Sequence, residues 1–106
     1  MQIQQGDVLF QKVVKLPADA LLVQDGGLIV LAQGEATGHH HAIQNSKSKL
    51  YVQEREGVKN IFLNVVWPET VTHQEHKVQV LEPGIWQIGQ VREKDWVSQM
   101  ERKVID

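Results

Sequence analysis

Short apolar runs rich in β-branched residues, separated by turn signals about every eight to twelve residues, constrain the fold of this chain most strongly. Val occurs 15 times, Ile 7 times and Thr 3 times among the 106 residues. Such side chains fit a pleated surface better than a helix. Turn-forming Pro, Gly, Asn and Asp residues interrupt the apolar runs throughout the chain. This rhythm predicts an all-β fold, either a small β-barrel or a sandwich.

The positions of the expected strands follow from the apolar runs. We expect the Asp-Gly-Gly segment 25–27 to turn a hairpin, and the polar segment 45–49 to turn a second one. The run 60–66 suits a central strand, which Pro68 ends because proline cannot donate to a ladder. The expected strands are residues 7–15, 20–24, 28–32, 38–44, 50–54, 60–66, 77–81 and 85–92.

The last twelve residues differ from the rest of the chain. Trp96, Met100 and Val104 recur every four residues, which predicts a short C-terminal helix over residues 95–106 that docks by an apolar stripe. An extended tail is the alternative. The chain has no internal repeat and no linker-like segment, and its length suits one domain, so we expect residues 1–106 to form a single β domain.

Composition and charge exclude several classes of function. Hydrophobic residues make up 42% of the chain and charged residues 23%, which is ordinary globular usage. The net charge of −2 gives no electrostatic reason to expect a nucleic-acid partner. No apolar run approaches the roughly 20 residues that cross a bilayer, so we expect no membrane partner. The absence of Cys excludes disulfides and thiolate metal sites and makes the cytoplasm the expected compartment.

All five His residues fall in two clusters, which makes them the strongest functional signal in the chain. On a strand that includes residues 39–41, alternation places His39 and His41 on the same face. Val78 and Val80 set an inward face for the later strand, and carrying that alternation backwards turns His76 inward. Val71 does the same for His73 on the preceding strand, provided the chain turns or bulges near residues 74–75. We therefore expect these four imidazoles to converge inside the barrel, with Glu75 near the rim.

Convergent imidazoles give a physical reason to bind a metal. Neutral imidazole binds first-row transition metals, and three His ligands with one open position form a recurrent catalytic arrangement. Without a ligand, inward imidazoles with a pKa of about 6.5 would be partly charged, mutually repulsive and costly to bury. A divalent transition metal such as Zn, Fe, Ni or Mn removes this conflict, as does an anionic ligand such as phosphate. The alternative is that the glycine-containing segment 34–38 leaves the triple His in a solvated loop.

The pattern around these histidines resembles the cupins, a family with a small β-barrel fold. Gly34 leads into His39-His40-His41, and a later His precedes a Pro-Gly turn. The resemblance implies that His39 and His41 take the roles of the two ligands in the first motif, and that His73 or His76 supplies the later one. Residues 42–46 contain no Glu where that family's first motif has one, so the resemblance carries no activity over.

A second similarity covers most of the chain. The segments GExTGHxH from Gly34, HxEH from His73 and PGxW from Pro83 are similar to those of short bacterial and phage proteins. The similarity implies that the chain shares a sequence motif with that group, but it implies no particular activity.

Three functional interpretations remain. The leading one is a metal-binding β-barrel protein that acts as a metal-dependent hydrolase, with Glu75 and His76 handling protons. The second is a metal-free phosphodiesterase or nucleotide-binding protein, in which Lys47 or Arg55 binds a phosphate-bearing small molecule. The third is a non-enzymatic interaction domain of the phage type. Homo-oligomerisation fits a small domain with three Trp residues, since association buries apolar surface.

Overall fold

The computed structural model describes residues 1–33 and 39–90 of the chain. Strands dominate these residues, because apolar and polar side chains alternate along them with a period of two. In β2, for example, Val8 and Phe10 are buried and Gln11 is exposed. The strands are β1 (Gln2–Gln5), β2 (Val8–Val13), β3 (Leu21–Gln33), β4 (His40–Arg55), β5 (Val58–Val65), β6 (Glu69–Val71), β7 (Gln79–Leu81) and β8 (Gly84–Gln90).

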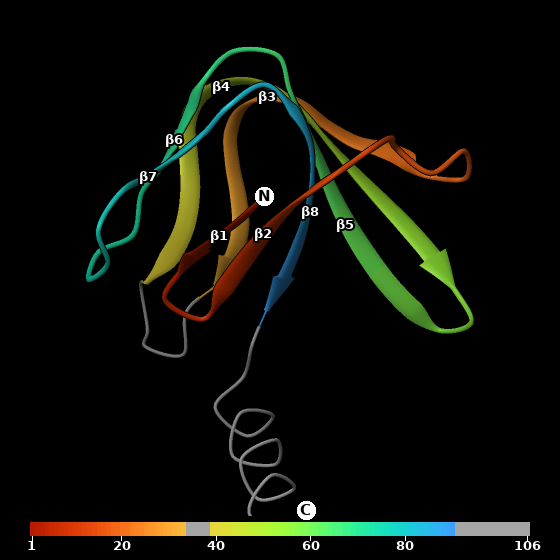
Figure 1. Cartoon of the computed structure of the whole chain (residues 1–106), viewed down its shortest axis with the longest axis horizontal. Helices are drawn as coiled ribbons and strands as arrows, with labels where there is room; N and C mark the ends of the chain where they lie inside the picture. The colour runs from red at the N-terminus through yellow and green to blue at the C-terminus, as the bar shows by residue number, and fades with distance from the viewer. Residues whose placement is uncertain (34–38, 91–106) are drawn as a thin grey trace, which may run out of the picture.

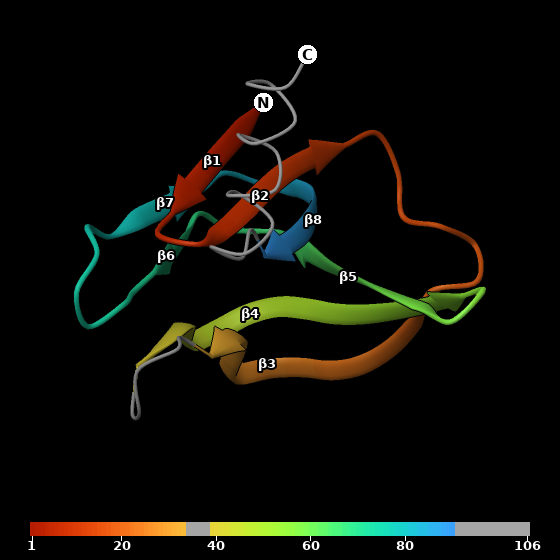
Figure 2. The same ribbon diagram turned by 90° about the horizontal axis from the view of Figure 1, so that it is seen from below.

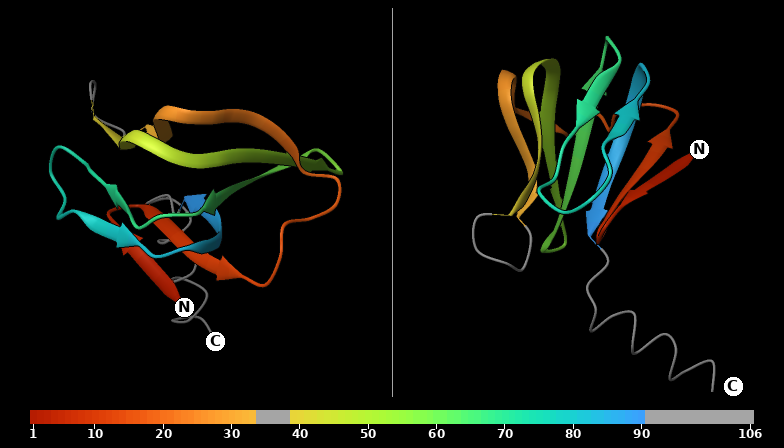
Figure 3. Two further views of the ribbon diagram at one scale, coloured as in Figure 1. Left: turned by 90° about the horizontal axis from the view of Figure 1, so that it is seen from above. Right: turned by 90° about the vertical axis from the view of Figure 1, so that its left-hand side faces the viewer.

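Six of the strands form one antiparallel sheet in the order β1-β2-β8-β5-β4-β3 (Figure 1). The sheet doubles back on itself: β3 and β4 form one layer, β1, β2 and β8 form the other, and β5 crosses between them (Figure 2). β6 and β7 pair as a separate hairpin, which packs against the core between the layers (Figure 3). The hairpin is tied to the start of β4, because Ala42 and Thr72 exchange two backbone hydrogen bonds of 3.0 and 2.8 Å.

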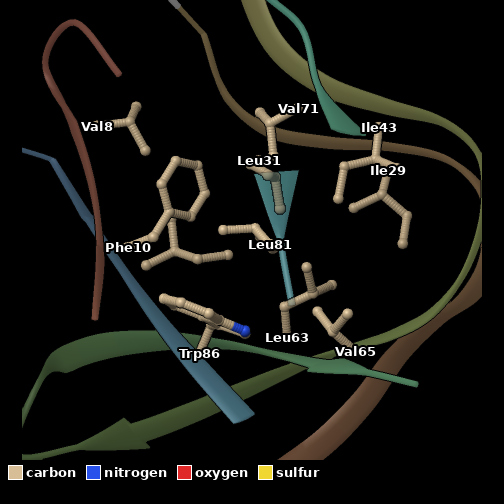
Figure 4. Close-up of a cluster of buried hydrophobic side chains, with 11 residues drawn as sticks. Val8, Phe10, Ile29, Leu31, Ile43, Leu63, Val65, Val71, Leu81 and Trp86 are labelled. Carbon is tan, nitrogen blue, oxygen red and sulfur yellow. The ribbon is translucent and has the colours of Figure 1, made fainter. Parts of the chain in front are cut away.

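The hydrophobic core fills the space between the two layers (Figure 4). Trp86 is fully buried there, and its indole N–H donates to the carbonyl oxygen of Glu82 at 2.9 Å. Burying one large apolar side chain contributes roughly 1.5–3 kcal/mol, so these side chains hold the two layers together. The core consists of Val8, Phe10, Ile29, Leu31, Ile43, Leu63, Val65, Val71, Leu81, Trp86 and Ile88.

The all-β prediction is confirmed, and the strand expected at 60–66 is β5, which lies inside the sheet. The two predicted hairpins are wrong. The glycine segment 25–27 lies within the continuous strand β3. The strand accommodates this segment through β-bulges and through the positive φ angles of Gly26 and Gly27. The polar segment 45–49 lies within β4, where Asn45 takes a φ of 51° and the strand continues.

Of the two expected architectures, a closed barrel is not found among the described residues. β1 and β3 are the outer strands of the six-stranded sheet, so the described residues do not close into a barrel. The helix expected over residues 95–106, like the segment 34–38, lies outside the described residues. Within the described part of the chain, no helix is long and apolar enough to span a membrane.

Candidate functional site

Three segments that are remote in sequence meet at one end of the folded-over sheet. They are the turn between β1 and β2, the start of β4 and the loop 72–78 between β6 and β7 (Figures 1 and 2). The first segment carries Asp7, the second His39 and His41, and the third His73 and His76. We call the four imidazoles together with Asp7 the histidine cluster.

The structure brings the four expected imidazoles together. The ring centroids of His41 and His73 are 4.3 Å apart, and those of His73 and His76 are 4.6 Å apart. The ring of His39 lies 5.7 Å from that of His73, and the rings of His41 and His76 are 6.2 Å apart with nearly parallel planes. His40 takes no part in these ring contacts, as expected for the residue between His39 and His41 on a strand.

His41 lies at the buried base of the cluster, with an oxygen atom against each ring nitrogen. Its Nδ1 is 2.8 Å from Oε1 of Gln5, and its Nε2 is 3.2 Å from Oδ1 of Asp7. The side chain of His41 is fully buried, whereas that of Asp7 is 28% exposed. Burial lowers the pKa of His41 below its ordinary value because desolvation penalises the imidazolium, and the hydrogen bond to Asp7 opposes this shift.

The solvent side of the cluster is formed by the loop 72–78 and His39. Nδ1 of His73 accepts a hydrogen bond from the backbone N–H of Glu75 at 3.1 Å. Desolvation lowers the pKa of His73, and the neighbouring His76 adds to the shift. Nδ1 of His39 lies 3.5 Å from the exposed carboxylate of Glu75, so Glu75 lies at the rim of the cluster, as expected. The alternation extended back to His76 is wrong, because Val78 and Val80 are exposed and residues 72–78 form a loop between β6 and β7.

The side chains as they stand do not form a metal-coordination shell. In residues 1–33 and 39–90, no three His, Asp or Glu side chains are grouped so that they could hold an ion. One feature of the geometry contributes to this: Nδ1 of His73 is occupied by the N–H of Glu75.

The basic residues expected to bind phosphate lie elsewhere. The Lys47 ammonium lies 5.4 Å from the centre of the Trp67 ring, further along β4 from His41. Arg55 is at the opposite end of β4, where its guanidinium lies 3.3 Å from the carboxylate of Asp19. The described structure therefore brings neither Lys47 nor Arg55 to the histidine cluster, and no observation favours the metal-free phosphodiesterase.

Sequence reasoning missed Gln5 and Asp7. Neither residue belongs to a motif that the sequence pattern singles out. The only local signal is Gly6 between them, which has a φ of 57° and lets the chain turn from β1 into β2. A Cβ atom on Gly6 would also collide with the imidazole of His76, so the turn passes directly against the cluster.

Together, these features define an all-β protein with a histidine cluster at one end of a folded-over sheet. The chain belongs to the family described as Domain of unknown function (DUF8820), which matches residues 4–91. No curated protein and no solved structure matches the chain. The resemblance to the cupins therefore gains no support from these comparisons.

Proposed function

We propose that this chain binds one divalent transition metal ion at the histidine cluster. The observation that carries the proposal is the contact between Nε2 of His41 and Oδ1 of Asp7, which are 3.2 Å apart at the base of a group of imidazoles. A nitrogen lone pair and a carboxylate oxygen repel each other unless a proton or a metal ion lies between them.

The spacing of these two atoms suits a metal ion. Ligand atoms about 2.0–2.1 Å from a tetrahedral ion lie roughly 3.3 Å from each other. Two imidazoles that share such an ion have ring centres roughly 5 Å apart, and the separations in the cluster run from 4.3 to 6.2 Å. Nitrogen and oxygen donors without sulfur suit Zn, Fe, Ni or Mn.

Small rearrangements of side chains would complete the coordination shell. His76 is exposed and can rotate about its side-chain torsions without disturbing the core. His41, Asp7 and His76 then supply three ligands. His73 becomes the fourth ligand if it exchanges its hydrogen bond from Glu75 for the metal, and His39 lies 5.7 Å from His73 as the remaining candidate.

The proposed chemistry is hydrolysis. A metal ion with an open position lowers the pKa of a bound water and so supplies a nucleophile near neutral pH. The exposed side of the cluster carries His39, Glu75 and His76, so a small-molecule substrate would approach from there. This side also gives Glu75 access to such a substrate.

Metal uptake by tag-free protein tests the proposal. We expect about one equivalent of bound metal by elemental analysis after equilibration with Zn²⁺, Ni²⁺ or Mn²⁺. Asp7→Asn should weaken binding by at least about tenfold in calorimetric titration. The fold should survive this change, because the Asn amide can donate to Nε2 of His41 and needs no cation between the two groups.

His40→Gln is the matched control, because His40 is adjacent to His41 but lies outside the ring contacts. It should bind metal as the wild type does. Negligible metal in the wild type, or equal affinity in wild type and Asp7→Asn, would contradict the proposal.

A further inference from the structure

The two outer strands of the six-stranded sheet differ in how their free edges are protected (Figure 2). β1 is four residues long, and three of these residues are Gln. β3 is 13 residues long, has Asp25 as its only charged residue and contains no Lys or Pro. Soluble proteins commonly keep an outer strand from associating by making it short, charged or proline-containing. β1 is short and polar, whereas β3 is neither.

Exposed apolar side chains are concentrated on β3. Five large apolar side chains of this strand are between 40% and 71% exposed, and no other described strand carries more than one. Leu21 pairs with Val52 and Leu22 with Tyr51, so these consecutive leucines lie on opposite faces of the sheet. A strand that is apolar on both faces is typical of a covered position. The five residues, which we call the β3 patch, are Leu21, Leu22, Val23, Leu28 and Val30.

The area of the β3 patch suits a weak interface between two proteins. Each CH₂ group corresponds to roughly 30 Å² of apolar surface, so the exposed parts of the five side chains amount to roughly 300 Å² per chain. Apolar atoms make up roughly 60% of a protein interface. Covering the patch therefore implies an interface of about 1,000 Å² in total, which is the lower limit for specific association.

We infer that a second copy of this chain covers the β3 patch and forms a two-fold symmetric dimer in which the two β3 strands run antiparallel. Two-fold symmetry brings the same surface of each copy together, so the patch needs a long, apolar and nearly uncharged partner, which β3 itself supplies. An axis at Gly26 and Gly27 would separate the two Asp25 residues by about 10 Å along the strands. Their repulsion is weak at that separation in physiological salt, and each Asp25 lies opposite Lys49 of its own β4.

Packing of side chains dominates this interface, because the backbone of β3 is irregular. Its pairing with β4 contains bulges, and Nε2 of Gln24 donates to the carbonyl oxygens of Gly26 and Leu28 at 3.1 and 2.7 Å. Bulges break the regular spacing of backbone groups, and these two carbonyls already have a donor. The free edge therefore offers only short stretches for pairing between strands, which is consistent with reversible association.

Sedimentation equilibrium of tag-free protein in the presence of a chelator measures the association. The wild type should change from monomer to dimer between about 1 μM and about 1 mM, as expected for an interface of this size. Because no free metal is present, the result does not depend on the proposed metal site. A wild type that remains monomeric over the whole range would overturn the inference.

Val23→Glu and Val58→Glu form a matched pair that locates the interface. Val23 and Val58 are 55% and 58% exposed, and each substitution adds one negative charge. Val23 belongs to the β3 patch, whereas Val58 begins the inner strand β5. Val23→Glu should weaken the dimer by at least about tenfold, because it brings two carboxylates into an apolar interface. Val58→Glu should associate as the wild type does.

Val30→Glu repeats the test at the other end of the β3 patch and should also weaken the dimer. Circular dichroism of each variant checks that the fold is kept. Association of Val23→Glu and Val30→Glu equal to that of the wild type would place the interface elsewhere and overturn the inference. Equal weakening by Val58→Glu would show a general effect of charge and would overturn it as well.

Discussion

At the scale of single residues, the chemistry of the site depends on where His41 is buried. Its imidazole has no exposed surface and an oxygen atom against each ring nitrogen. Burial disfavours the charged ring, whereas Gln5 and Asp7 both present acceptors to it. The two acceptors favour a proton on each ring nitrogen, whereas burial opposes the charge of the doubly protonated ring. The proposed metal ion would satisfy Asp7 and Nε2 without the second proton.

The buried neutral state of His41 predicts how stability depends on pH. The folded-state pKa is lowered, so below the unfolded pKa of about 6.5 the unfolded chain binds a proton that the folded chain resists. In metal-free protein, the free energy of unfolding should therefore fall as the pH decreases from 7 toward 5, by at most about 1.4 kcal/mol per pH unit for each such proton. His73 contributes in the same direction, but more weakly because it is more exposed to solvent screening.

Urea denaturation across this pH range measures the effect. His41→Asn should flatten the profile between pH 5 and 7, and His40→Asn should keep the wild-type slope. A wild-type profile that rises toward low pH would contradict the prediction.

Gly6 gives a second prediction at this scale. Both Gly6 and Gly57 have positive φ angles of 57° and 77°, but only at Gly6 would an added Cβ meet the ring of His76. Ala at Gly57 should cost about 1 kcal/mol from backbone strain alone. Ala at Gly6 should cost more and also weaken metal binding, because the ring of His76 must move. Equal losses of stability in the two variants, with metal binding unchanged, would count against this arrangement.

At the scale of secondary structure, β4 connects the core to the site. Its first part pairs with β3 and carries His41, and its last part, from Lys49, pairs with β5 as well. Between them the strand passes Asn45 in a left-handed conformation and two buried serines. The N–H of Ser48 donates to Oγ of Ser46 at 2.9 Å, which satisfies a backbone group where the strand is irregular.

Substitution by Ala should have opposite effects on stability at Ser46 and at Ser48. The hydroxyl of Ser48 is fully buried and has no hydrogen-bond partner among the described residues. Ser48→Ala should therefore stabilise the protein by about 1 kcal/mol, since it removes an unsatisfied polar group. Ser46→Ala should destabilise it by about 1 kcal/mol because the N–H of Ser48 loses its acceptor. Thermal and urea denaturation would measure both, and a loss of stability in Ser48→Ala would disprove the argument.

At the scale of the whole molecule, the histidine cluster lies where separate parts of the fold are brought together. β1 and β2 belong to one layer, β4 belongs to the other, and the loop 72–78 belongs to the separate hairpin. The apolar core holds these parts together, and hydrogen bonds of Gln5 connect them at the cluster. A ligand bound there would contact all three parts at once.

Metal binding should therefore stabilise the entire domain. An ion that binds only the folded state adds about 2.7 kcal/mol to the free energy of unfolding at a free concentration 100 times its dissociation constant. Differential scanning calorimetry with and without Zn²⁺ should show a higher melting temperature for the wild type and His40→Gln. Asp7→Asn should show a smaller rise at the same concentration, about 1.4 kcal/mol or less for a site at least tenfold weaker, and a rise in Asp7→Asn equal to that of the wild type would place the ion elsewhere.

The amino-acid sequence by itself determined the class of fold and the candidate imidazoles. β-Branched runs and turn residues are local signals, so they predicted an all-β fold and the inner strand β5. Strand alternation is also local, and it correctly separated His39 and His41 from His40.

The tertiary structure decided what depends on contacts between distant segments. The glycine segment 25–27 and the polar segment 45–49 have the composition of turns, but bulged pairing between β3 and β4 keeps both strands continuous. Gln5 and Asp7 became part of the cluster because folding brings the turn between β1 and β2 against His41. No periodicity in the sequence encodes that contact, since it arises only when the two layers close over a shared apolar core.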